Sequence, residues 1–211
     1  MSTMSLVGHA CTSFRCCLAM VCLLALPAWG NTPHSSSASA VMTSPASMEG
    51  MAAPLALRGQ SRYSYFGFDV YDASLWVAPD FQPEQHEKQL LALELHYLRA
   101  FQAKDIAKRS LQEMRRAGAL TAAQETQWMA AMQRVFPNVR RGDRLLGLHR
   151  PGQSAEFWLN GHKRGEIRDP EFARLFFGIW LSPKTSAPAL RQALIGPAWS
   201  PSPSDQQVQS P

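Results

Sequence analysis

The stretch Ser61-Arg-Tyr-Ser-Tyr-Phe-Gly-Phe-Asp-Val-Tyr-Asp-Ala-Ser-Leu-Trp76 decides the fold of this chain. Aromatic residues alternate in it with small or polar ones, and this alternation is typical of β-strands. Gly67 interrupts the pattern, as a glycine does at a turn, a bulge or a close backbone approach. The stretch therefore predicts two adjacent antiparallel strands, at Leu57–Phe66 and Phe68–Val77.

Two side chains of this strand pair, Arg62 and Tyr71, are candidates for binding an anion. Arg62 is a cation among aromatic residues, and Tyr71 follows on the neighbouring strand. A guanidinium presents a planar fork of donors to a carboxylate, and a phenol hydroxyl adds one more donor. In the alternative interpretation Arg62 points to solvent and Tyr71 belongs to the core.

The first 30 residues have the pattern of a secretory signal peptide. Arg15 precedes an apolar run from Cys16 to Leu26, and small residues close the segment, so we expect cleavage after Gly30. The run is shorter than the roughly 20 apolar residues of a membrane span, although an uncleaved anchor is an alternative. We therefore expect a periplasmic or secreted protein, with no integral membrane span after signal cleavage.

Cysteine and histidine positions limit the chemistry of the exported chain. All four cysteines, at positions 11, 16, 17 and 22, lie in the expected signal, so disulfides and thiol catalysis are excluded after cleavage. No pair of histidines has the spacing of metal ligands, and the chain has neither a Gly-Lys-Ser phosphate loop nor a Gly-x-Ser-x-Gly motif. We expect no cofactor and no metal.

Composition divides the rest of the chain into one domain and two flanking segments. Residues 31–54, rich in Ser, Ala, Pro and Met, predict a disordered linker, and residues 197–211 predict a similar tail. The folded part is then residues 55–196, one domain by length. Basic residues are scattered among acids at a net charge of +5, whereas a nucleic-acid surface needs a concentrated basic stripe. We expect no nucleic-acid partner.

Periodicity and caps predict the remaining elements. Residues 90–98 alternate as a half-buried strand, residues 105–117 form an amphipathic helix, and a capping box at Thr121 begins a second helix. Three more strands are expected at residues 144–149, 155–159 and 162–167.

Turn and cap residues complete the prediction. Asn160-Gly161 is a strong hairpin signal, which favours a turn role for Asn160 over a catalytic one. Asp169 caps a helix over 171–181 that buries Trp180, and Ser186 caps a short last helix. Consecutive strands with short turns give an antiparallel sheet, and helices gathered on one face make the fold class α+β.

Several short motifs together resemble bacterial chalcone isomerase-like proteins. The motifs are Arg62 with Phe68–Trp76, the strand Leu91–Leu98, Phe136-Pro-Asn-Val with Gly142-Asp-Arg-Leu145, Asn160-Gly161, Asp169–Leu181 and Leu190–Gly196. Their order and spacing cover nearly the whole predicted domain. The resemblance implies an open-faced β-sandwich, with helices on one side of a long antiparallel sheet and an apolar cleft between the two layers.

The resemblance also implies which residues to consider for function. Plant enzymes of this family close a ring on a chalcone with an arginine where Arg62 stands, but they use a threonine where this chain has Tyr71. They also use a tyrosine and an asparagine on a helix, for which Asp105–Phe136 offers no convincing match.

Non-catalytic relatives bind fatty acids and hold the carboxylate with an arginine and a tyrosine. The resemblance therefore implies a non-catalytic domain in which Arg62, Tyr71 and Tyr97 bind a small apolar carboxylate such as a fatty acid. Two alternatives stay open: an isomerase acting on a chalcone-like molecule, and a structural or interaction module of the cell envelope.

Overall fold

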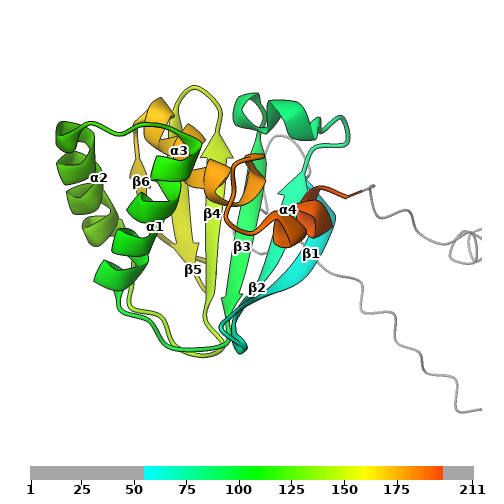
Figure 1. The fold of residues 1–211 in the computed structure, drawn as a ribbon, viewed down its shortest axis with the longest axis horizontal. Coiled ribbons are helices and arrows are strands. Elements are labelled where there is room, and N and C mark those ends of the chain that lie inside the picture. The colour runs from blue at the N-terminus through cyan, green and yellow to red at the C-terminus, as the bar shows by residue number, and fades with distance from the viewer. Residues whose placement is uncertain (1–54, 197–211) are drawn as a thin grey trace, which may run out of the picture. The chain divides into compact units, whose positions relative to one another are not determined.

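The computed structural model describes residues 55–196, which form a single antiparallel sheet covered by helices (Figure 1). The strands pair in chain order, from β1 to β6. They are β1 Ala56–Tyr65, β2 Phe68–Val77, β3 Leu91–Tyr97, β4 Arg144–Arg150, β5 Ser154–Leu159 and β6 His162–Ile167. The predicted α+β fold class is confirmed. The expected signal peptide, linker and tail lie outside the described residues.

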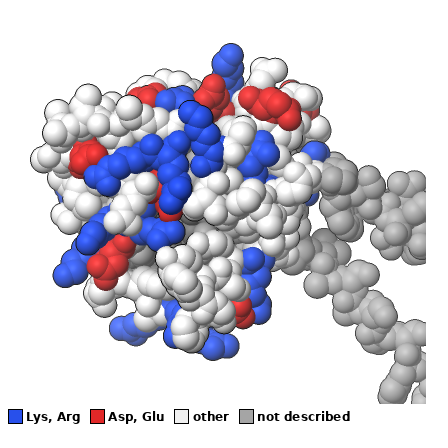
Figure 2. Space-filling model, in the orientation of Figure 1, with Lys and Arg blue, Asp and Glu red and all other residues white. Residues whose placement is uncertain are grey.

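Four α-helices of the described part lie on one face of this sheet (Figure 1). They are α1 Ala103–Ala117, α2 Ala122–Val135, α3 Pro170–Leu181 and α4 Pro188–Ile195. Helix α3 packs on β4 and β5, α2 on β6, and α4 on β1 and β2, while α1 packs on α2 and α3. A 3₁₀ helix at Pro83–Lys88, which the sequence analysis did not predict, joins β2 to β3. Basic and acidic side chains lie interspersed over the helical face (Figure 2).

Local signals explain where several elements begin. The Thr121 hydroxyl accepts from the Gln124 N–H at 3.2 Å, and the Gln124 side chain accepts from the Thr121 N–H at 2.9 Å, so the predicted capping box is present. One Asp169 carboxylate oxygen accepts the first free N–H groups of α3. Ser186, by contrast, does not cap α4. That helix begins at Pro188 with Ala187 as its N-cap residue and no side-chain cap, because proline already fixes the first helical φ.

The β1–β2 hairpin turns on Phe66 and Gly67, whose φ angles are +49° and +76°. Tyr65 and Phe68 are paired across the turn, so Phe66 belongs to the turn and not to the strand that was predicted to include it. Two positive φ angles are the requirement of a two-residue hairpin turn, which usually has asparagine and glycine. A left-handed conformation costs a residue with a Cβ about 1–2 kcal/mol, so this turn is strained at Phe66.

The main core fills the space between the sheet and the helices. Trp128, Phe157, Phe172 and Phe177 are fully buried there, and Trp180 is only 8% exposed, as predicted. One close approach fixes α4 against the first strand: a Cβ on Gly59 would lie 2.3 Å from the Ala193 carbonyl oxygen. Only glycine allows this contact, and it sets the position of the helix that forms one wall of the cavity described next.

Candidate functional site

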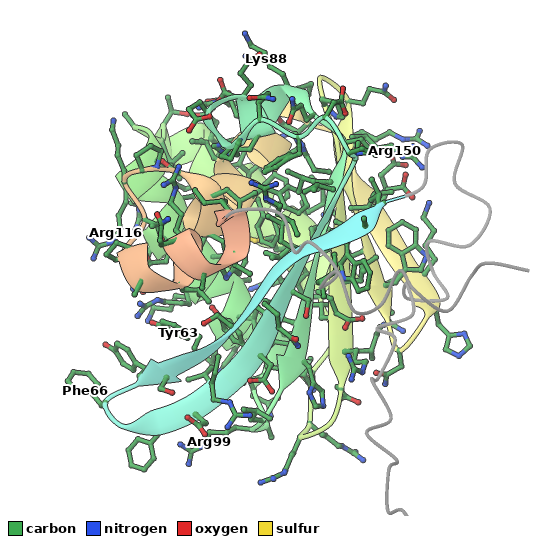
Figure 3. All side chains as sticks on the ribbon, turned by 90° about the vertical axis from the view of Figure 1, so that its right-hand side faces the viewer. Tyr63, Phe66, Lys88, Arg99, Arg116 and Arg150 are labelled. Carbon is green, nitrogen blue, oxygen red and sulfur yellow. The ribbon has the colours of Figure 1, made fainter. Side chains whose placement is uncertain are left out.

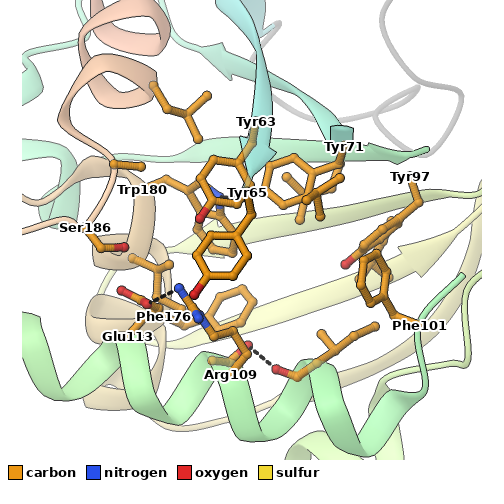
Figure 4. A pocket seen from close by; sticks show the side chains of 18 of the residues that line it. Tyr63, Tyr65, Tyr71, Tyr97, Phe101, Arg109, Glu113, Phe176, Trp180 and Ser186 are labelled. Carbon is orange, nitrogen blue, oxygen red and sulfur yellow. Dashed lines mark hydrogen bonds and ion pairs between the residues drawn. The ribbon is translucent and has the colours of Figure 1, made fainter. Parts of the chain in front are cut away.

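A cavity of about 350 Å³ lies between the first three strands and helices α1, α3 and α4 (Figure 4). This volume is within the range of about 300–1,000 Å³ that small-molecule sites occupy. Its walls are mostly apolar. They include Leu95, Phe101, Phe176, Ile179 and Leu190. Such a cavity can enclose an apolar molecule.

A row of tyrosines from three adjacent strands forms the sheet side of the cavity. Tyr63 of β1 pairs directly with Tyr71 of β2, and Tyr71 pairs with Tyr97 of β3. The first two rings stack with centroids 5.1 Å apart, and the second pair is edge-on at 6.1 Å. Because side chains alternate between the faces of a strand, this register turns all three rings toward the helices.

The phenols of this row are neutral hydrogen-bonding groups. Burial raises the pKa of both Tyr71 and Tyr97 well above the ordinary value of a phenol. The Tyr71 hydroxyl accepts a hydrogen bond from the Trp180 indole N–H at 3.0 Å. That contact leaves the hydroxyl proton of Tyr71 free to be donated to a ligand oxygen.

Arg109 of α1 is the one cation among the described residues that line the cavity. Its guanidinium lies 5.3 Å from the centre of the Tyr65 ring, and its Nη2 lies 2.7 Å from Oε1 of Glu113. Glu113, only 7% exposed, is also 3.1 Å from Nε of Arg116. The carboxylate of Glu113 thus lies between two guanidiniums. Asp105 lines the cavity as well, and it is exposed on the first turn of α1.

Arg62, the arginine that the sequence analysis favoured, does not line this cavity. Its side chain is 52% exposed and donates to the Asp72 carboxylate at 2.7 and 3.1 Å and to Asp69 at 3.0 Å. Because Tyr63 faces the helices, strand alternation turns its neighbour Arg62 to the other face. The structure thus has one part of the alternative interpretation, Arg62 toward solvent, and departs from the other part, because Tyr71 lines the cavity.

A more open groove adjoins the cavity mouth, and Arg62 does line this groove, together with Tyr65, Arg109, Arg116 and Ser186. The structure thus brings Tyr71 and Tyr97 together in the cavity and supplies Arg109 in the place expected for Arg62 (Figure 4). In the sequence, Arg109 is one of many basic residues scattered among acids, and its charge does not distinguish it from the others. The signal that could have found it is the recurrence of polar Ser110 and Glu113 on the buried side of α1.

The described residues hold neither a cluster of metal-binding side chains nor a helix that could cross a membrane. Among residues 55–196, no three His, Cys, Asp or Glu side chains gather closely enough to hold a metal ion. No helix in the same range is long and apolar enough to cross a bilayer.

The chain belongs to the chalcone isomerase-like family, whose sequence model matches residues 37–196. It is 26% identical over 138 residues to an uncharacterized protein of Haemophilus influenzae. That match covers 65% of this chain and 66% of the relative, slightly less than two thirds of its length. The fold is similar to that of a fatty-acid binding protein of Arabidopsis thaliana whose crystal structure is known, with a TM-score of 0.54. The two sequences are 9% identical, and the match covers 69% of this chain and 88% of that one. The resemblance inferred from the sequence motifs is confirmed.

Proposed function

We propose that this protein binds one small apolar carboxylate, such as a fatty acid, in the cavity between sheet and helices, without catalysing a reaction on it. The observation that carries the proposal is a mostly apolar cavity with a single lining cation, Arg109, near its mouth. A solved protein of similar fold is named for fatty-acid binding, which supports the same class of ligand.

The apolar tail of the ligand would lie against the tyrosine row and the side chains of α3 and α4. Burial of apolar surface contributes about 25 cal/mol per Å², so an alkyl chain that fills the cavity supplies most of the binding free energy. The aromatic walls, with Tyr71 and Phe176 on opposite sides, accept either an alkyl chain or a flat ring.

The carboxylate would bind at Arg109. A guanidinium has five N–H donors, and the contacts of Arg109 with Glu113 and with the Tyr65 hydroxyl leave several of them for a ligand carboxylate. Arg109 and Arg116 together carry two positive charges around the single negative charge of Glu113, so an incoming carboxylate neutralises this cluster. The neutral Tyr71 and Tyr97 hydroxyls add donors deeper in the cavity.

Calorimetric titration with dodecanoic acid and dodecanol tests this assignment. Arg109→Gln should weaken binding of the acid by roughly 1.5–3 kcal/mol, the scale of a hydrogen bond to a charged group, and leave binding of the alcohol nearly unchanged. Arg134→Gln, on the exposed side of α2, makes the same chemical change away from the cavity and should bind both ligands like wild type.

Two results would refute the proposal: wild type that binds no carboxylate, or Arg109→Gln that binds the acid as tightly as wild type. Arg62→Gln is a second control in the same series. Because the Arg62 side chain faces away from the cavity, its loss should change the affinity for the acid little. Ring closure of a chalcone is the assay for the isomerase alternative, and we expect none, since Tyr71 occupies the position of the threonine that the family's enzymes use.

A further inference from the structure

The exposed large apolar side chains of residues 55–196 gather in one place, the tip of the β1–β2 hairpin. Tyr65 is 47% exposed, Phe66 83% and Phe68 60%. Figure 3 shows Phe66 at the far end of the hairpin, pointing away from the rest of the domain. Single exposed apolar residues are common on protein surfaces, but a contiguous group of them marks an interaction site.

The turn at this tip is made with a residue that the backbone does not favour. Phe66 has a φ of +49°, in the left-handed region where asparagine is well tolerated and bulky residues are rare. An asparagine would relax the turn and would also remove an aromatic ring from water. Within the fold, Phe66 has an edge-on ring contact with Tyr65, centroids 4.5 Å apart, and most of its side chain remains in water, which points to contact with a partner.

Side-chain contacts join the two strands of the hairpin next to this aromatic tip. Arg62 bridges to Asp69 and Asp72 across the two strands, and the Ser64 hydroxyl donates to Asp69 at 2.6 Å. These cross-strand contacts lie directly behind the turn. They join the two strands next to the turn and give Arg62 a structural role.

Arginines border the tip. The Arg99 guanidinium lies 4.7 Å from the centre of the Phe68 ring (Figure 3). The Gly142 N–H donates to the Tyr97 carbonyl and the Tyr97 N–H donates to the Asp143 carbonyl, each at 2.8 Å, and these bonds align the loop after β3 with the loop before β4. Arg140 and Arg141, both exposed, come just before β4 in that loop and therefore lie at the same end of the domain as Arg99, which follows β3.

These arginines form no ion pair within residues 55–196, although the charge of Arg140 acts on the nearby Asp143 carboxylate. Across residues 55–196, no carboxylate lies within ion-pair distance of Arg99, Arg140 or Arg141. Asp143, the acid next to them in the chain, is engaged by the Arg140 backbone N–H at 2.7 Å and by the Asn160 amide at 3.0 Å. Arg99, Arg140 and Arg141 outnumber Asp143, the one acid beside them, whereas Arg62 lies between Asp69 and Asp72 on the hairpin, so this end of the domain is weakly basic.

We propose that this end of the domain docks on an anionic lipid bilayer. Tyr65, Phe66 and Phe68 would enter the interfacial region, where aromatic rings are favoured, while the bordering arginines contact headgroup phosphates. A second copy of the chain is a poorer partner, because two tips in contact would bring their arginines together.

Docking would place the bilayer next to the mouth of the cavity. Tyr65 belongs to the aromatic tip and also lines the cavity, and Arg109 stacks on the same ring. An apolar molecule could then pass between bilayer and cavity with little exposure to water. This consequence rests on the proposed function, whereas the docking itself does not.

Flotation with vesicles tests the docking on the protein as cells produce it, without added ligand. We expect binding to vesicles of about three parts phosphatidylcholine to one part phosphatidylglycerol, weaker binding to phosphatidylcholine alone, and loss of the difference at high salt. Phe66→Asn should lower the partition coefficient about tenfold, because burial of one phenylalanine side chain is worth at least that factor. Its unfolding temperature should equal or exceed that of wild type. Any contribution from residues 1–54 is common to both proteins.

Phe66→Trp is the matched variant that keeps an aromatic ring at the tip. It should bind like wild type and add tryptophan emission to that of the six native tryptophans, and stronger quenching by brominated lipids than in wild type would report insertion of the tip. The double variant Arg99→Gln/Arg140→Gln should lose the preference for anionic vesicles. The proposal is overturned if wild type does not float, if Phe66→Asn partitions like wild type, or if sedimentation velocity shows a dimer that depends on Phe66 in place of vesicle binding.

Discussion

Trp180 contacts both the core and the tyrosine row, so its replacement measures how much these contacts contribute to the free energy of unfolding. Its ring packs edge-on against Phe176 with centroids 5.5 Å apart, and its indole N–H donates to the Tyr71 hydroxyl at 3.0 Å. The change to test first is Trp180→Ala, with Trp180→Phe as the variant that keeps an aromatic ring and removes the donor.

The expected magnitudes follow from these contacts. Removing a large buried aromatic side chain costs about 3–5 kcal/mol of unfolding free energy. Because one side of Trp180 faces the cavity, where it lacks packed neighbours, we expect a loss near the lower end, about 3 kcal/mol. Trp180→Phe should cost about 1–2 kcal/mol, of which the lost hydrogen bond to Tyr71 accounts for roughly 1 kcal/mol.

Urea unfolding of a double-mutant cycle separates the hydrogen bond from the packing. Trp180→Phe and Tyr71→Phe, singly and together, should give a coupling energy of about 0.5–1.5 kcal/mol. A coupling below about 0.3 kcal/mol would show that the two side chains are not hydrogen-bonded in solution. A loss below about 1 kcal/mol for Trp180→Ala would show that this face of α3 is not part of the core.

Two further predictions concern the position of α4 and export. Gly59→Ala should lower the free energy of unfolding in urea by about 1–3 kcal/mol, because the new Cβ would meet the backbone of α4. The control is Gly178→Ala, whose Cβ would have its nearest neighbour at 3.5 Å and which should be neutral or stabilising. Equal effects of the two changes would contradict the close approach at Gly59. N-terminal sequencing of the protein from the compartment outside the cytoplasm should begin at Asn31, and an intact Met1 in the cytosolic fraction would count against export.

The fold could be predicted from the sequence because most signals in this chain are local. Each of these signals determines the backbone conformation of a few neighbouring residues. The structure has all of them: the strand β2, the capping box at Thr121, the Asn160-Gly161 turn and the Asp169 cap. Ser186 was misjudged because Pro188 can begin a helix without a side-chain cap.

The site was harder to predict because it depends on which face each side chain takes. Arg62 and Tyr63 are neighbours in sequence, and a shift of one residue exchanges the cavity face of a strand for its outer face. Arg109 lies far from both in the chain and reaches the cavity only because α1, packed on α2 and α3, forms one of its walls. Charge and spacing along α1 are equally compatible with a solvated helix, so only the tertiary arrangement distinguishes the two.

The measurement that tests the central claim most directly is native mass spectrometry of the protein purified from its own compartment, followed by extraction and identification of any bound molecule. We predict one bound apolar carboxylate per chain. Ser186→Trp, which fills the cavity mouth from an exposed loop position, should lose that molecule and keep its fold. A wild-type protein that carries no small molecule, or one whose bound molecule is unaffected by Ser186→Trp, would contradict the account.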